Sequence, residues 1–124
     1  MTTAVKAKAP SWKRAYESGP ALYSWRRSVG LNRETFAKLS KVSERTLATY
    51  EKHARLPKPI RAQVTEAVRL VKALLDIIPG EELPKWLATP NHAFGDRRPW
   101  TLIQRGEGDR VWEMIHQTRQ GAFA

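Results

Sequence analysis

The chain has 124 residues, of which 41% are hydrophobic and 27% charged, and it carries a formal net charge of +10. This length allows one hydrophobic core, or two small helical units that share a seam, and excludes a large catalytic domain. The absence of cysteine excludes disulfides, thiolate metal sites and thiol nucleophiles, and it fits a reducing cytoplasm.

Apolar segments are short throughout the sequence. No run approaches the roughly 20 residues that a membrane-spanning helix needs, and the N-terminus has no apolar signal core. We therefore expect a cytoplasmic protein with no membrane partner.

The positive charge is concentrated in the first half of the chain. Residues 1–57 contain 12 Lys or Arg against 4 Asp or Glu, whereas residues 58–124 contain 10 against 8. An excess of positive charge attracts the phosphate groups of nucleic acid, and the affinity of such binding depends on the salt concentration. The alternative is a solvated basic surface that keeps the protein soluble.

Residues 1–19 have basic side chains among small residues and no sustained apolar period. They predict a basic, partly disordered N-terminal arm, with disorder at least to Pro10. Trp12 and Tyr16 are four residues apart and could pack on the body as a short helical turn. Two roles for the arm stay open, a contact with DNA phosphates and a frayed tail.

A helix is predicted from Pro20, with one apolar stripe formed by Leu22, Trp25 and Val29 and an end at Gly30. Two further short helices follow between Leu31 and Glu51. Asn32 and Ser43 each precede one of them and are suited to cap it with a side-chain oxygen. Two short helices joined by a tight turn are the layout of a helix-turn-helix, whose second helix enters the DNA major groove.

The spacing in this region resembles the Xre/Cro/cI-type helix-turn-helix. The residues that carry the resemblance are Leu22-x-x-Trp25-Arg26-x-x-x-Gly30-Leu31, then Phe36-Ala37, and then Val42-Ser43-x-x-Thr46-Leu47-x-x-Tyr50-Glu51. Lys41 stands where the family usually has glycine. A left-handed backbone there would carry a strain that glycine avoids.

The resemblance implies a set of DNA-binding residues. Glu44, Arg45 and Thr49 are expected at base edges, with Arg45 reading guanine and Glu44 accepting from cytosine. Phosphate contacts are expected from Arg33, Ser43, Thr46 and Lys52. Glu51 is expected to make an internal polar contact. For each single residue the alternative is an exposed polar side chain without a partner.

A long helix follows a connector that contains Pro57 and Pro59. Apolar residues from Ile60 to Ile78 step by threes and fours, which predicts a helix of about five turns. A second apolar strip on this helix predicts that more than one face is buried. Either the C-terminal half or a second subunit could cover that face.

After Pro79-Gly80 the sequence predicts three short helical pieces, cut by Pro90, Gly95, Gly106 and Gly108. The last of them is expected to begin at Asp109 and to stop at Gly121.

The spacing of this half resembles the toxin-binding domain of Xre/MbcA/ParS-type antitoxins. The motif reads Trp86-Leu87-x-x-Pro90-Asn91-x-x-Phe94-Gly95-x-x-x-Pro99-x-x-Leu102, followed by Gly108, Val111 and Gly121-Ala122-Phe123. Asp96 replaces the usual second glycine, and the bulky Trp100 follows Pro99. Together with the helix-turn-helix, the resemblance covers roughly residues 20–124.

This resemblance implies an antitoxin that binds and inhibits a RES-domain toxin, an NAD-consuming enzyme, and that represses the shared operon. The toxin-binding residues expected are Trp86, Asn91, Arg98, Trp112, His116, Arg119, Gln120 and Phe123. We expect Trp112 to Ala124 to cover the entrance of the toxin's NAD pocket. The alternative is that the tail folds back on Trp86 or Trp100.

No constellation for catalysis is evident in the sequence. His53, His92 and His116 lack partners at metal-ligand spacing, and no glycine-rich phosphate loop is present. We therefore expect no metal, no cofactor and no enzyme activity.

The sequence thus predicts an all-α protein: the arm at 1–19, a helix-turn-helix domain with its long helix at 20–78, and a toxin-binding domain at 79–124. Its expected partners are the RES-domain toxin, operator DNA and a second copy of the chain. The alternatives are a stand-alone repressor whose C-terminal half dimerises it, and a DNA-coating protein without sequence preference.

Overall fold

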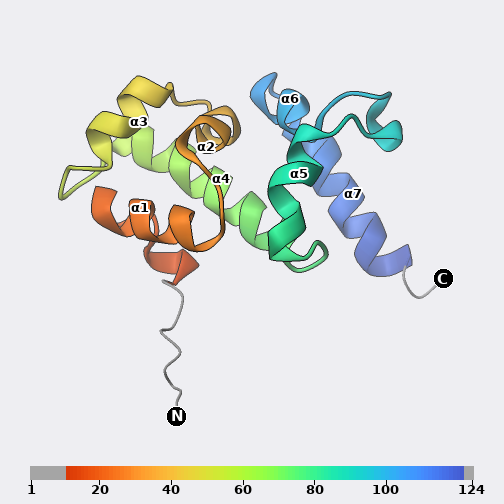
Figure 1. Ribbon diagram of the computed structural model, residues 1–124, viewed down its shortest axis with the longest axis horizontal. Coiled ribbons are helices and arrows are strands. Elements are labelled where there is room, and N and C mark those ends of the chain that lie inside the picture. The colour runs from red at the N-terminus through yellow and green to blue at the C-terminus, as the bar shows by residue number, and fades with distance from the viewer. Residues whose placement is uncertain (1–10, 122–124) are drawn as a thin grey trace, which may run out of the picture.

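The computed structural model describes residues 11–121. Within that range the chain forms seven α-helices and no strand, which confirms the predicted all-α fold (Figure 1). The helices are α1 (Gly19–Ser28), α2 (Arg33–Ser40), α3 (Glu44–Tyr50), α4 (Lys58–Leu75), α5 (Leu83–Ala88), α6 (Pro99–Gln104) and α7 (Gly108–Gly121). Three short 3-10 helices complete the fold, η1 (Trp12–Arg14), η2 (Gly80–Glu82) and η3 (His92–Phe94).

The segment before α1 packs on the long helix α4. Ala15 is fully buried, and Trp12 and Tyr16 lie against the core. The ammonium group of Lys72 on α4 lies 5.7 Å from the centroid of the Trp12 ring. The guanidinium group of Arg61 lies 5.9 Å from the centroid of the Tyr16 ring. The predicted helical turn at these aromatics is confirmed. The disorder expected up to Pro10 concerns residues outside the described range.

Gly19 brings the first turn of α1 against the end of α3. Its backbone N–H donates to the carbonyl oxygen of His53 at 2.9 Å. A Cβ at this position would overlap the carbonyl oxygen of Tyr50 and lie 2.6 Å from the carbonyl carbon of Glu51. The two helices approach this closely because residue 19 has no side chain.

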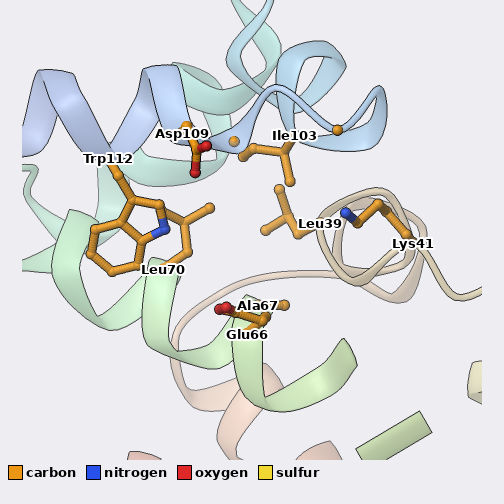
Figure 2. Close-up of a pocket in the computed structure, with 10 residues that line it drawn as sticks. Leu39, Lys41, Glu66, Ala67, Leu70, Ile103, Asp109 and Trp112 are labelled. Carbon is orange, nitrogen blue, oxygen red and sulfur yellow. The ribbon is translucent and has the colours of Figure 1, made fainter. Parts of the chain in front are cut away.

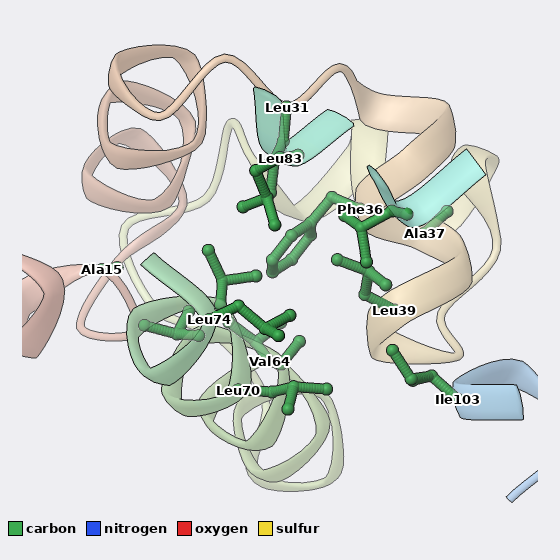
Figure 3. Close-up of a cluster of buried hydrophobic side chains, with 14 of the residues drawn as sticks. Ala15, Leu31, Phe36, Ala37, Leu39, Val64, Leu70, Leu74, Leu83 and Ile103 are labelled. Carbon is green, nitrogen blue, oxygen red and sulfur yellow. The ribbon is translucent and has the colours of Figure 1, made fainter. Parts of the chain in front are cut away.

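One continuous core joins the helix-turn-helix to the C-terminal half (Figure 3). Leu83 of α5 points toward Leu31, and Ile103 of α6 points toward Leu39 of α2 in the same close-up. At the rim of this contact, the Lys38 ammonium lies 4.9 Å from the centroid of the Trp100 ring. Leu70 and Ala73 of the second apolar strip of α4 are buried in this core, and Ile77 packs against it, so the strip is covered within the chain itself.

The breaks between helices follow the sequence with corrections at α4 and α7. The long helix α4 begins at Lys58 rather than Ile60, and it ends at Leu75, before Ile78 and the predicted break at Pro79-Gly80. Gly106 has φ +86° and separates α6 from α7, as expected of glycine in a left-handed turn. Gly108 does not interrupt a helix, because it is the first residue of α7, one position before the predicted start at Asp109.

In the part of the chain that the structure describes, no helix is both long enough and apolar enough to cross a membrane.

Candidate functional site

The helix-turn-helix is fixed by two side-chain caps. Asn32 Oδ1 accepts from the Thr35 backbone N–H at 2.8 Å, and Ser43 Oγ accepts from that of Thr46 at 3.1 Å. Each cap satisfies a backbone donor that has no partner inside its own helix. Both predicted N-caps are confirmed.

The turn between α2 and α3 has the left-handed conformation that the family pattern predicts. Lys41 has φ 60° and ψ 29°, and its carbonyl oxygen accepts from Gln63 Nε2 of α4 at 3.4 Å. A side chain in this region costs about 1 kcal/mol relative to glycine. The structure thus retains the expected turn with a strained residue.

The outer face of α3 is polar and exposed. Glu44, Arg45 and Thr49 all point away from the core, whereas Leu47 is buried. Within residues 11–121, Glu44 and Arg45 form no ion pair, so their charges face solvent.

The hydroxyls on this face are already hydrogen-bonded within the chain. Ser43 Oγ donates to Thr46 Oγ1 at 2.9 Å, and Thr49 Oγ1 donates to the Arg45 carbonyl oxygen at 3.1 Å. Any base contact by Thr49 would thus compete with this bond. Glu44 and Arg45 are the best placed of the expected base-reading side chains.

A buried arginine orients the C-terminal end of α3. Arg26 of α1 binds Glu51 through two hydrogen bonds, Nε to Oε2 at 2.8 Å and Nη2 to Oε1 at 3.1 Å. Arg33 of α2 donates to the same carboxylate from Nη2 at 3.0 Å, with 39% of its side chain exposed. The network ties α1, α2 and α3 together, and the internal contact expected of Glu51 is confirmed.

Sequence reasoning placed Arg26 in the helix-turn-helix motif but missed its burial, to 3% exposed, and its pairing with Glu51. Its partner lies 25 residues away, so local periodicity carries no signal for the pair. Two arginines share the single negative charge of Glu51, so the network has a net positive charge. The partly exposed Arg33 places this charge at the surface, near Lys52. Both of these expected phosphate contacts line the same hollow, which Tyr23 and Ala48 also border.

Three of the expected toxin-binding residues shape the loop before α6. Asn91 Oδ1 accepts from the Ala93 N–H at 2.9 Å, and Arg98 Nε donates to the Ala88 carbonyl oxygen at 2.9 Å. The Trp86 ring meets Phe94 edge-on, with centroids 6.4 Å apart. Asp96, in place of the usual glycine, adopts φ 62°. These residues therefore have structural contacts, whatever they bind.

A second group of expected toxin-binding residues lies together on α7. The rings of Trp112 and His116 stack with centroids 6.3 Å apart, and both residues line an open hollow with Gln120. Arg119 points elsewhere, because its Nη2 pairs with Asp76 Oδ2 of the α4 C-cap at 3.0 Å. Phe123 lies outside the described residues. Apart from Arg119 and Phe123, the expected residues thus form two separate groups, one around the loop before α6 and one on α7.

The turn between α6 and α7 is clamped by an ion pair. Arg97 Nη1 and Nη2 donate to the two carboxylate oxygens of Glu107 at 3.0 and 3.1 Å. These hydrogen bonds lower the pKa of Glu107 below its ordinary value and raise that of Arg97 above its own. The clamp connects the loop at residue 97 to the start of α7.

A hollow of about 190 Å³ lies where the two halves meet (Figure 2). Leu39 and Lys41 of the helix-turn-helix border it on one side, and Ile103 and Trp112 on the other. The turn at Lys41 and the first turns of α7 are therefore close neighbours. Among the described residues, no group of three His, Asp or Glu is arranged to hold a metal ion.

The C-terminal half matches a known family model. Residues 73–121 match the antitoxin Xre/MbcA/ParS C-terminal toxin-binding domain. This segment is similar to that domain family. The resemblance of the chain to the Xre/MbcA/ParS-type antitoxins is thereby confirmed.

Two similar proteins are antitoxins by name. The mycobacterial cidal antitoxin MbcA of Mycobacterium bovis and that of Mycobacterium tuberculosis are each 26% identical to this chain over 96 residues. The aligned region covers 77% of this chain and 85% of each relative. No solved structure matches the chain significantly. The match of residues 73–121 to the toxin-binding domain model, together with these relatives, supports an antitoxin role in a toxin-antitoxin system.

Proposed function

We propose that this chain is an antitoxin that inhibits a RES-domain, NAD-consuming toxin and represses its own operon by binding operator DNA. The observation that carries the proposal is the combination of a toxin-binding domain with a complete helix-turn-helix on one core. The antitoxin role rests on the match of residues 73–121 to the family model. The toxin class and the repression are inferences from the sequence resemblance.

For toxin inhibition, the proposed contact is the outer face of α7. Trp112, His116 and Gln120 lie on this face with the charged residues Asp109, Arg110 and Glu113. A half-buried tryptophan beside charged neighbours is a common anchor of protein interfaces. In the proposal, α7 and the tail after it cover the entrance of the toxin's NAD pocket.

For repression, the proposed reader is the N-terminal part of α3. Glu44 and Arg45 reach base edges there, and Arg33 and Lys52, which line one hollow, contact the DNA backbone. Two-fold operators are bound by two-fold dimers, so the proposal includes a homodimer with half-sites about one helical turn apart.

The experiment begins with the neighbouring reading frame. If that frame encodes a RES-type protein, the two proteins are co-expressed and co-purified, and NAD consumption is measured with and without this chain. A stable complex with suppressed NAD loss is expected. A RES neighbour that does not bind the chain, or that consumes NAD equally in its presence, would contradict the proposal.

Repression is tested separately with the promoter of the chain's own gene. Arg45→Ala should weaken promoter binding by about 1 to 3 kcal/mol and relax base preference at one position. A DNA-coating protein would be almost unaffected by this change. A stand-alone repressor would show the promoter effect without any toxin partner.

A further inference from the structure

Two neighbouring hollows connect the exposed face of α3 with the outer surface of α1. The first, of about 310 Å³, is bordered by Tyr23 of α1, Arg33 of α2 and Ala48 of α3. Ala48 lies three residues after Arg45, so the two residues share one face of the helix. The first hollow therefore lies on the flank of the face that is proposed to approach DNA.

The second hollow, of about 420 Å³, is lined by three arginines and by no acidic side chain. Arg26, Arg27 and Arg33 border it, together with Tyr23 and the turn from Gly30 to Asn32. Tyr23 and Arg33 also border the first hollow, so the two lie side by side. Arg27 is exposed and forms no ion pair within residues 11–121.

The acidic residues next to these arginines are paired with cations. Glu51 borders the first hollow, but only 3% of its side chain is exposed, and its carboxylate accepts from Arg26 and Arg33. Glu34 borders neither hollow, and its Oε2 lies 3.5 Å from Lys38 Nζ. Three arginines against the one carboxylate of Glu51 leave a net charge of +2 around the second hollow. Such an excess attracts an anion.

Tyr23 and Arg27 form a pair on the outer surface of α1. Arg27 Nη1 donates to Tyr23 Oη at 2.7 Å, and the two guanidinium groups of Arg26 and Arg27 lie 5.3 and 5.5 Å from the centroid of the Tyr23 ring. Among residues 11–121, the Tyr23 hydroxyl has no acceptor for its own proton. A hydroxyl that accepts from a cation is a stronger donor, so this proton is available to an anion in the hollow.

We propose that the second hollow binds a backbone phosphate of the operator, which accepts hydrogen bonds from the Tyr23 hydroxyl and from Arg27. Neither residue is among the DNA contacts expected from the sequence. Arginine suits the role because its planar group donates to more than one acceptor at once, here the tyrosine oxygen and the phosphate.

The position of the site determines its role. A phosphate held beside α1 lies on the flank of α3, so the contact fixes the orientation of the recognition helix and reads no base. Helix α1 thereby takes part in DNA binding, although it presents no side chain to the bases. This inference rests on the proposed operator binding.

The test uses two variants of the full-length protein in promoter-DNA titrations at several salt concentrations. Arg27→Gln removes one charge, so the slope of log affinity against log salt should become shallower by about 0.9. Equivalently, its affinity loss should be about threefold larger at 50 mM than at 200 mM salt. Tyr23→Phe keeps the charge and the ring but removes the donor. Its slope should be parental, and its affinity should fall on the order of tenfold at every salt concentration.

The matched control is Arg69→Gln, which removes an exposed arginine of α4 that borders neither hollow. The slope of this control should be unchanged. Thermal unfolding of Arg27→Gln and Tyr23→Phe should match that of the parent, because both side chains are exposed. Arg27→Lys should retain the slope, since the charge remains.

The outcomes separate this inference from the operator function. A wild-type chain that binds no promoter DNA would overturn both. If the wild type binds, a parental slope in Arg27→Gln or a parental affinity in Tyr23→Phe overturns the inference alone. A shallower slope in Tyr23→Phe would show that the hydroxyl acts only by holding Arg27, which overturns the direct bond to phosphate.

Discussion

The close approach at Gly19 makes a sharp prediction about stability. In Gly19→Ala, the new methyl group would overlap the Tyr50 carbonyl oxygen and lie 2.6 Å from the Glu51 carbonyl carbon. Both obstacles are backbone atoms at the end of the recognition helix, so no side-chain rotation relieves the overlap. Helix α1 must therefore move away from α3.

The expected cost follows from what that movement disrupts. Overpacking against a core costs about 1 to 3 kcal/mol when side chains can adjust. Here the backbone must adjust, and the 2.9 Å bond from Gly19 to the His53 carbonyl oxygen is at risk. We expect a loss of at least about 3 kcal/mol of unfolding free energy. For a chain of this size that corresponds to a fall of roughly 10 °C in Tm.

The assay is urea and thermal unfolding followed by circular dichroism, with Gly108→Ala as the matched control. A Cβ at Gly108 meets no atom within 4 Å, and the residue is helical. The control should therefore be neutral or gain up to about 1 kcal/mol. If Gly19→Ala is as stable as Gly108→Ala, the account of how α1 is positioned on α3 is refuted.

Three further predictions concern the turn, the clamp and the tail. Lys41→Gly should raise the unfolding free energy by about 1 kcal/mol, because glycine adopts φ 60° without strain; an unchanged or lower urea midpoint would contradict this. The pKa of Glu107 is lowered in the folded chain, so its contribution to stability is present above the unfolded pKa and is lost as pH falls through the folded one. Glu107→Gln should accordingly flatten the acid side of the stability profile, whereas an unchanged profile from pH 7 to 3 would show that the clamp contributes nothing. Deletion of residues 121–124 should release toxin activity in the NAD assay, and full neutralisation by the shortened chain would exclude the tail as a cover.

Local features of the fold could be predicted from the sequence. The caps at Asn32 and Ser43 were predictable because a side chain and the N–H it accepts from are three residues apart. The αL turn at Lys41 was predictable from the family pattern, although lysine is a poor residue for it. The spacing of apolar residues along α4 likewise predicted a helix of about five turns, which is the observed length.

Contacts between distant segments could not be predicted in the same way. The Arg26–Glu51 pair joins residues 25 positions apart, and the motif that contains Arg26 does not state which side chain it binds. The role of Gly19 was also missed, because a glycine near a helix start predicts nothing about which backbone it touches. The position of Gln104 beside Ser43 depends on how α6 packs on α2, which periodicity does not specify.

The shared core has a consequence for the lifetime of the protein. Leu39 and Leu31 are buried together with Ile103 and Leu83, which lie beyond the connection between α4 and α5. A single cut at that connection, followed by loss of the C-terminal piece, would expose apolar surface on the helix-turn-helix half and lower its stability as well. Degradation of either half would therefore remove the other, so that one turnover rate governs the whole chain.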